Sequence, residues 1–188
     1  MIINERQLLL ASIFLLAPTV FAQHRVFTVD AEASTAKFSL GDVLHSVHGT
    51  FRVQSGSVEF DASEGKISGS VVVAAGSGKS GNDTRDRKMH AEILDSAHFA
   101  EMSFAPSSYQ GTIVPLGDST IQVTGAFTLH GAPHEITVPM QIHIEGTKSV
   151  VTAHFAVPYV KWGLKDPSTF ILRVAKEVEI DLMLVGRL

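Results

Sequence analysis

The sequence contains no cysteine, which excludes a disulfide framework, a thiolate metal site and a lipid-modified cysteine behind a signal peptide. It also has no cluster of like charge, because its lysines and arginines are scattered and the formal net charge is only −4. This distribution gives no indication of a nucleic-acid partner or of binding to an anionic membrane surface. No nucleophile elbow, phosphate-binding loop or zinc-protease motif is present. The residue patterns therefore give no support to an enzyme of these classes.

The chain has one long apolar run, and it lies at the N-terminus. Leu8 to Leu16 is almost entirely apolar, and Val20-Phe21-Ala22 has the small residues that a signal peptidase requires. The run is too short for a good membrane anchor. We predict a signal peptide over residues 1–22 that is cleaved after Ala22, and one exported domain over residues 23–188 without an integral membrane anchor. A bacterial periplasm is the expected location.

Most of the remaining chain alternates between apolar and polar residues, which is the pattern of half-buried β-strands. The clearest strands are Ile121–Leu129 and Ile136–Ile144, separated by a turn over His130–His134. Further strands are predicted over Val26–Asp30, Thr35–Leu40, Gly49–Val53, Ser57–Asp61, Ile67–Ala75, Met102–Tyr109, Val151–Val157, Phe170–Val174 and Val178–Leu184. Eight or more antiparallel strands with one apolar face each must stack as two sheets or close into a barrel. Small residues at many inner positions favour a cavity.

One stretch has the pattern of a short helix, over about residues 83–98. Asn82 is a good N-cap residue, and no glycine or proline follows within the stretch. Met89, Ile93 and Leu94 lie at helical spacing and form one narrow apolar face. We expect this helix to cover the mouth of a barrel.

Four motifs carry a resemblance to a known family. They are Gly81-Asn82-x-x-Arg85-Asp86-x-x-Met89, Val123-x-Gly125-x-Phe127-x-Leu129-His130-Gly131 with Ile136-Thr137-Val138, Lys161-Trp162-Gly163-Leu164, and Val47-x-Gly49-x-Phe51. The first is the most specific, since it is similar to a Gly-Asn-x-x-Arg-Asp-x-x-Leu motif that precedes a short helix. On these motifs the sequence resembles the YceI-like family of exported, lipocalin-like proteins that bind polyisoprenoid and related long apolar molecules, over roughly Phe27–Val185.

The resemblance implies an all-β fold, an eight-stranded antiparallel lipocalin-like barrel with an elongated apolar interior. It implies no catalysis and no cofactor other than a bound isoprenoid or other long-chain lipid, so that the partner is a long-chain apolar small molecule; we also consider a homodimer. The candidate lining residues are Phe38, Phe51, Val53, Phe60, Val71, Val73, Met89, Ile93, Phe99, Phe104, Val123, Phe127, Met140, Phe155, Trp162 and Phe170. Structural roles are assigned to Asn82, Arg85, Asp86, Gly125 and Gly131.

The resemblance does not assign a functional role to every residue of these motifs. The sequence departs from the family pattern at Ala33-Ser34, Gly41-Asp42, Lys88 and Phe99-Ala100, which leaves the contacts to a lipid headgroup unassigned. Arg85 and Asp86 have the residue types of a catalytic pair, but we interpret them as anchors that fix the helix to the barrel rim.

The sequence has nine histidines, which make metal binding the alternative function. His45 and His48 lie three residues apart, so they share a metal only if their segment is a turn or a helix, because a strand sends such residues to opposite faces. We assign no metal site and interpret the histidines as rim or surface residues. The leading hypothesis is an exported carrier or store of a polyisoprenoid, an isoprenoid quinone or a fatty-acid-like chain. The alternative is a periplasmic metal-binding protein, and a hydrolase has the least support.

Overall fold

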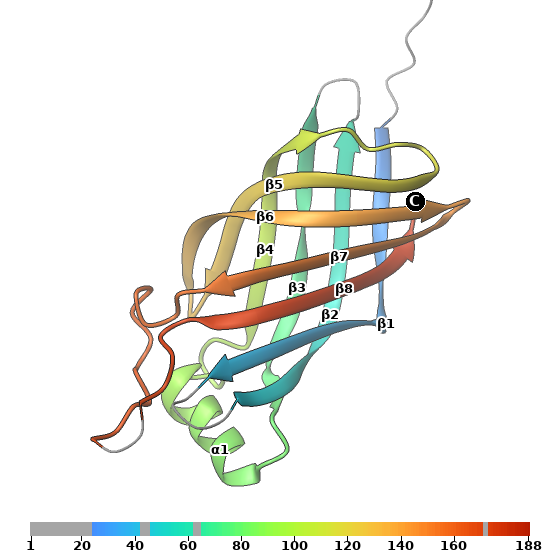
Figure 1. Cartoon of the computed structure of the whole chain (residues 1–188). Helices are drawn as coiled ribbons and strands as arrows, with labels where there is room; N and C mark the ends of the chain where they lie inside the picture. The colour runs from blue at the N-terminus through green and yellow to red at the C-terminus, as the bar shows by residue number, and fades with distance from the viewer. Residues whose placement is uncertain (1–23, 42–45, 62–64, 171–172) are drawn as a thin grey trace, which may run out of the picture.

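The computed structural model describes residues 24–41, 46–61, 65–170 and 173–188. Its strands are β1 (His24–Gly41), β2 (Ser46–Asp61), β3 (Lys66–Lys79), β4 (Glu101–Gly111), β5 (Gly117–Leu129), β6 (Ala132–Glu145), β7 (Lys148–Val157) and β8 (Val178–Arg187). Each strand pairs antiparallel with the next, and β8 pairs with β1, so the sheet closes into a barrel (Figure 1). This confirms the predicted eight-stranded barrel and excludes two stacked sheets. The expected signal peptide lies outside the described residues.

The β5–β6 hairpin has the most regular pairing in the barrel. Its ladder runs without a register shift from Gly117 opposite Ile144 to Leu129 opposite Ala132. His130 and Gly131 both have positive φ, 51° and 76°, as a tight two-residue hairpin turn requires. The turn predicted over His130–His134 is therefore too long, because the left-handed conformation of His130 lets β6 begin at Ala132.

Two predicted gaps between strands are irregularities inside longer strands. β2 continues through the gap predicted between Val53 and Ser57, with a register shift against β3 between Val53 and Ser55. β1 likewise continues from Thr28 to Ala36. There the Ser34 hydroxyl donates to the Asp30 carbonyl (2.7 Å) and accepts from the Val185 N–H (3.0 Å), which replaces part of the ladder. A bulge and a turn use the same small polar residues, so the sequence pattern does not separate them.

The described residues of the strand predicted over Phe170–Val174 do not form a strand, and residues 171–172 lie outside the described part of the chain. Among the described residues of this segment, only Val174 forms an isolated bridge. The neighbouring Ala175 N–H donates to the Gly41 carbonyl (2.8 Å), and the Tyr159 hydroxyl donates to the Ala175 carbonyl (2.8 Å). These bonds hold a long loop between β7 and β8 rather than a strand.

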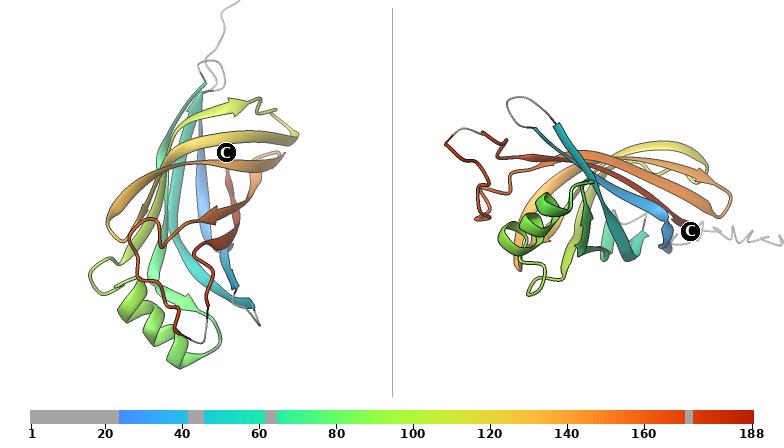
Figure 2. Two further views of the ribbon diagram at one scale, coloured as in Figure 1. Left: turned by 60° about the vertical axis from the view of Figure 1, so that its left-hand side comes forward. Right: turned by 90° about the horizontal axis from the view of Figure 1, so that it is seen from below.

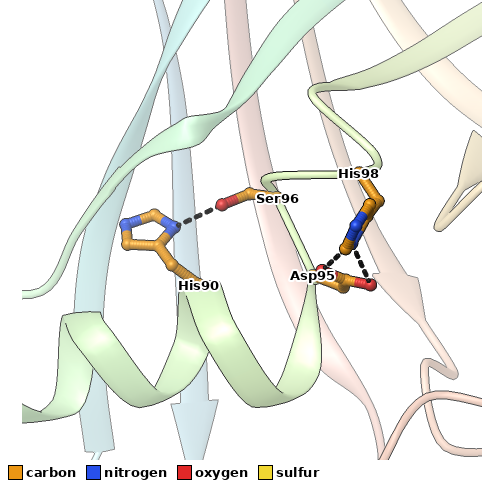
Figure 3. Close-up of polar contacts among 4 residues, drawn as sticks. All are labelled: His90, Asp95, Ser96 and His98. Atoms are coloured by element: carbon orange, nitrogen blue, oxygen red, sulfur yellow. Dashed lines mark hydrogen bonds and ion pairs between the residues drawn. The ribbon is translucent and has the colours of Figure 1, made fainter.

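The helical segment is shorter than predicted. α1 (Asp83–Lys88) continues as one π-helical turn, η1 (Met89–Ile93). Asp95 then adopts a positive φ of 43°, its carbonyl accepts from the N–H groups of His98 and Phe99, and its carboxylate binds the His98 ring (Figure 3). This turn ends the helix before the predicted limit at residue 98.

The short helix and the β7–β8 loop lie at the same end of the barrel, away from the C-terminus (Figure 2). The helix contributes the buried Leu94 to a core cluster at this end. The other members are Ala75, Met102, Leu129, Val157, Tyr159 and Leu164. A second cluster fills the interior farther along the barrel with Phe27, Ala36, Val53, Val71 and Leu184. The helix therefore covers one end of the barrel, as predicted.

Candidate ligand-binding interior

The cross-strand register places most of the predicted lining residues on the inner face of the barrel. They are Phe38, Phe51, Val53, Phe60, Val71, Val73, Phe104, Val123, Phe127, Met140 and Phe155. Met89 and Ile93 from the helix and Trp162 from the β7–β8 loop pack against the cluster at the covered end. The alternate residues of the same strands, such as Gln122 and Gln141, are exposed. The inner wall is consequently almost entirely apolar.

The inner wall is not packed equally along its length. Val53, Val123 and Val138 are each 1% exposed. Five larger inward-facing residues are only partly buried: Phe51, Phe104, Phe127, Met140 and Phe155. An eight-stranded barrel has room for side chains or one small ligand. The larger residues of the inner wall are thus less completely buried than the valines between them.

A hollow outside the barrel is of a different kind. It has a volume of about 590 Å³ and lies over the outer faces of β2 and β3, next to Ser96 and Ala100. Its lining includes Arg52, Gln54 and Lys79. Because these side chains are polar or charged, this hollow does not match a long apolar ligand.

Aromatic rings from four segments meet near the covered end. Phe127 of β5 lies 6.2 Å from Phe155 of β7 and 5.8 Å from Trp162, measured between ring centroids. The His134 ring of β6 stacks on Trp162 at 4.2 Å with an interplanar angle of 1°. We call these four residues the aromatic group. Trp162 was predicted to line the interior, whereas His134 was assigned only to a turn.

The sequence alone could have placed His134 on the inner face, because it lies two and four residues before Ile136 and Val138, which face inward on β6. Its cross-strand partner is Phe127, and directly paired residues of antiparallel strands point to the same face. His134 therefore faces inward. Its Nε2 atom is buried and has no hydrogen-bond partner among the described residues; Ser149 Oγ is the other such atom.

Two predicted lining residues lie elsewhere. Phe99 packs on the β5–β6 hairpin, with its ring 4.1 Å from the His130 ring. A Cβ atom on Gly131 would lie 2.6 Å from the Phe99 ring, so the glycine accommodates this contact as well as the turn. Phe170 is fully exposed. Its assignment to the lining is wrong, because the segment that was expected to carry it inward as a strand is a loop.

The β7–β8 loop is fastened to both the barrel and the helix. Tyr159 is 5% exposed, and its burial, with a smaller contribution from Asp166, raises the pKa of its hydroxyl to about 12. The Lys165 ammonium donates to the Glu92 carboxylate of η1, which holds the pKa of Glu92 below its ordinary value. The loop and the helix thus form one cover over this end.

The Asn-x-x-Arg-Asp motif fastens the start of the helix to the end of β3. Asn82 Oδ1 accepts from the Arg85 N–H (3.0 Å), which caps α1. The Asp86 carboxylate accepts from the N–H (2.9 Å) and the hydroxyl of Ser80. Arg85 donates from Nε to the Ser80 hydroxyl (2.7 Å) and from its guanidinium to the Ser80 carbonyl (2.8 Å). Ser80, which the sequence analysis missed, is the common partner of both charged residues.

A second contact holds the same helix against β3. His90 Nε2 lies 2.9 Å from the Gly78 carbonyl oxygen, and Nδ1 lies 3.4 Å from Ser96 Oγ (Figure 3). A carbonyl only accepts, so Nε2 carries the proton and Nδ1 of the neutral ring accepts from the serine hydroxyl. Gly78 also lies close to Phe51 and Met89, where a Cβ atom would meet both side chains at 2.5 and 2.7 Å. The helix therefore approaches the barrel closely at this glycine.

We expect Asp86→Asn to lower the melting temperature by a few degrees at neutral pH. The Ser80 hydrogen bonds hold the pKa of Asp86 below its ordinary value of 3.8, so the charged carboxylate stabilises the fold above that value. This contribution is lost as the pH falls through the lowered pKa of the folded state. The difference in melting temperature between wild type and variant should therefore shrink below about pH 3.8. Ser80→Ala should remove part of the same acid dependence, and a pH-independent difference would contradict this assignment.

Several of the described histidines lie apart from one another on the outer surface. His143 Nδ1 lies 2.7 Å from Asp118, and His154 Nδ1 lies 2.7 Å from Asp181. His48 Nδ1 lies 2.8 Å from Ser39 Oγ, whereas His45 is outside the described residues. No group of three or more histidine, aspartate or glutamate residues that could hold a metal ion occurs in the described part of the chain. None of the described helices is long and apolar enough to span a membrane.

A closed antiparallel barrel with an apolar inner face and a short helix over one end defines a lipocalin-like class of binding proteins. The YceI-like domain matches residues 27–185, and the chain belongs to this family. A UPF0312 protein of Pseudomonas fluorescens is 28% identical over 148 residues, which cover 74% of this chain and 73% of that protein.

Solved structures of two relatives share the fold. Burkholderia cenocepacia BcnA has a TM-score of 0.68 and 19% identity, with coverage of 84% of this chain and 99% of that chain. A polyisoprenoid binding domain from Saccharophagus degradans has a TM-score of 0.64 and 15% identity, with coverage of 86% and 97%.

Proposed function

We propose that this protein holds a long apolar lipid, such as a polyisoprenoid, an isoprenoid quinone or a fatty-acid-like chain, inside the barrel as a carrier or store. The observation that carries the proposal is the set of large inward-facing apolar residues, such as Phe51, Phe127 and Phe155, that are only partly buried in a closed barrel. Family membership and the similarity to a structure described as a polyisoprenoid binding domain support it.

The energetics of burial require a long chain. Each methylene removed from water contributes about 0.8 kcal/mol, so ten of them contribute roughly 8 kcal/mol. The loss of translational and conformational freedom offsets a large part of this gain. A short acyl group would therefore bind weakly, whereas a chain threaded along the inner face would bind well.

Extraction of the purified protein with an apolar solvent should release such a lipid, identified by mass spectrometry. A matched preparation of the Phe127→Asp variant should release little, because the charge lies against the site of the chain. A blank purification from cells without the protein controls for lipid carried over from membranes. One bound metal ion per chain together with no extractable lipid would overturn the proposal and favour the metal-binding alternative.

The proposed location is the bacterial periplasm, after removal of the signal peptide. Val20 and Ala22 supply the small residues that the peptidase pockets accept. N-terminal sequencing of exported protein should therefore begin at Gln23. An uncleaved chain, or a start beyond Val26, would contradict this assignment.

A further inference from the structure

A polar ring faces the apolar interior at the covered end. His134 pairs with Phe127 on the inner side of the β5–β6 ladder. One face of its ring is covered by Trp162, at a centroid distance of 4.2 Å. Trp162 in turn contacts Phe127. His134 is thus held against apolar neighbours instead of pointing into water.

The Nε2 atom of this ring has no hydrogen-bond partner among the described residues, although it is buried. Native structures rarely leave a buried polar atom unpaired, because its lost hydration is not replaced. Ser149 Oγ, the other such atom, belongs to a residue that is 1% exposed, whereas the His134 residue keeps accessible surface. His134 is therefore the less enclosed of the two residues.

We propose that His134 Nε2 forms a hydrogen bond with a hydroxyl or carbonyl oxygen at the head of the bound lipid, and that the Trp162 ring moves to admit it. This inference rests on the proposed lipid-binding function. The neutral imidazole suits both groups, since either ring nitrogen can carry the proton and Nε2 can donate or accept accordingly. The stacked Trp162 ring lies on a loop, not on a barrel strand, so it can move without breaking the ladder.

The surroundings favour an uncharged head over a diphosphate. Phosphate groups are bound by arginine and lysine side chains or by clustered N–H groups. Near this end, however, Lys165 is paired with Glu92, and Arg85 is bound to Ser80. The ring contact of His134 is with the aromatic Trp162. An alcohol or a carbonyl compound fits these neighbours because it needs one hydrogen bond and no counter-charge.

Trp162 is the single tryptophan of the chain, so its fluorescence reports binding at this position directly. We would titrate the protein with four ligands of equal chain: geranylgeraniol, geranylgeranial, the corresponding tetraprenyl hydrocarbon and geranylgeranyl diphosphate. Wild type should bind the alcohol, the aldehyde or both about tenfold more tightly than the hydrocarbon, the effect of one neutral hydrogen bond. If only the alcohol binds more tightly than the hydrocarbon, the head group is a hydroxyl; if only the aldehyde does, it is a carbonyl.

Substitutions at His134 separate the hydrogen bond from the apolar contacts. His134→Phe keeps an aromatic ring for Trp162 to stack on but should lose the tenfold preference for the alcohol or the aldehyde over the hydrocarbon. His134→Gln, which restores a donor and an acceptor, should recover part of it. His143→Phe, on the same strand but exposed and paired with Asp118, is the matched control and should change nothing.

The outcomes distinguish this inference from the proposed function. If wild type binds none of the four ligands by equilibrium dialysis, lipid binding itself is wrong. If the hydrocarbon binds as tightly as the alcohol and the aldehyde, or if His134→Phe keeps the preference, only the head-group assignment is wrong. Tighter binding of the diphosphate that His134→Phe leaves unchanged would also overturn the head-group assignment. Binding of the alcohol without a change in Trp162 emission would overturn it as well.

Discussion

Phe127→Asp should lower the affinity for an apolar fluorescent probe by a hundredfold or more. Phe127 faces inward and contacts Phe155 and Trp162, so the new carboxylate would lie against the bound chain without a partner of opposite charge. Burying an unpaired charge costs several kcal/mol unless the group protonates, and about 2.8 kcal/mol corresponds to a hundredfold in affinity. The measurement is a probe titration with circular dichroism on the same samples.

Two control variants separate lost binding from lost folding. Gln122→Asp adds the same charge on the same strand, but on the exposed outer face, and should leave binding unchanged. Phe127→Leu keeps an apolar side chain on the inner face and should retain most of the affinity. A folded Phe127→Asp protein that binds the probe like wild type would show that the ligand lies elsewhere.

Leu94→Ala should reduce the free energy of unfolding by about 3 kcal/mol, the middle of the range for a buried leucine. Leu94 is 8% exposed and joins the cluster formed with Tyr159, Leu164 and Leu129. Truncation removes the largest buried contact of the helix and leaves a cavity under the cover. Chemical denaturation followed by circular dichroism measures the effect.

The control for this variant is Ala91→Ser, at an exposed position of the same helical turn. A surface change of this kind should alter stability by about 0.5 kcal/mol or less. If Leu94→Ala also lost less than about 1 kcal/mol, the helix would contribute little to the stability of the barrel. The cover would then be a loosely held element rather than part of the core.

The alternation of apolar and polar residues predicted which side chains form the inner wall of the barrel. Val123 and Met140 were assigned to inner faces because successive side chains of a strand point to opposite sides, and the structure places them there. The narrow apolar face of the helix was predicted for the same kind of reason, since helical spacing brings Met89 and Ile93 onto one side. Both properties are local, so a sequence shows them without any knowledge of the fold. His134 was missed only because a turn was assigned over it.

Other features depended on contacts between distant segments. The closure of β8 on β1 separates a barrel from two sheets, and no local pattern contains that pairing. The bulge near Ser34 exists because its hydroxyl binds Val185 across the barrel seam. Phe170 is apolar but lies on a loop that the Tyr159–Ala175 hydrogen bond shapes from outside the segment. The sequence by itself determined which faces are apolar. The tertiary structure decided which segments pair and which ring is left buried without a partner among the described residues, because each of these depends on neighbours far away along the chain.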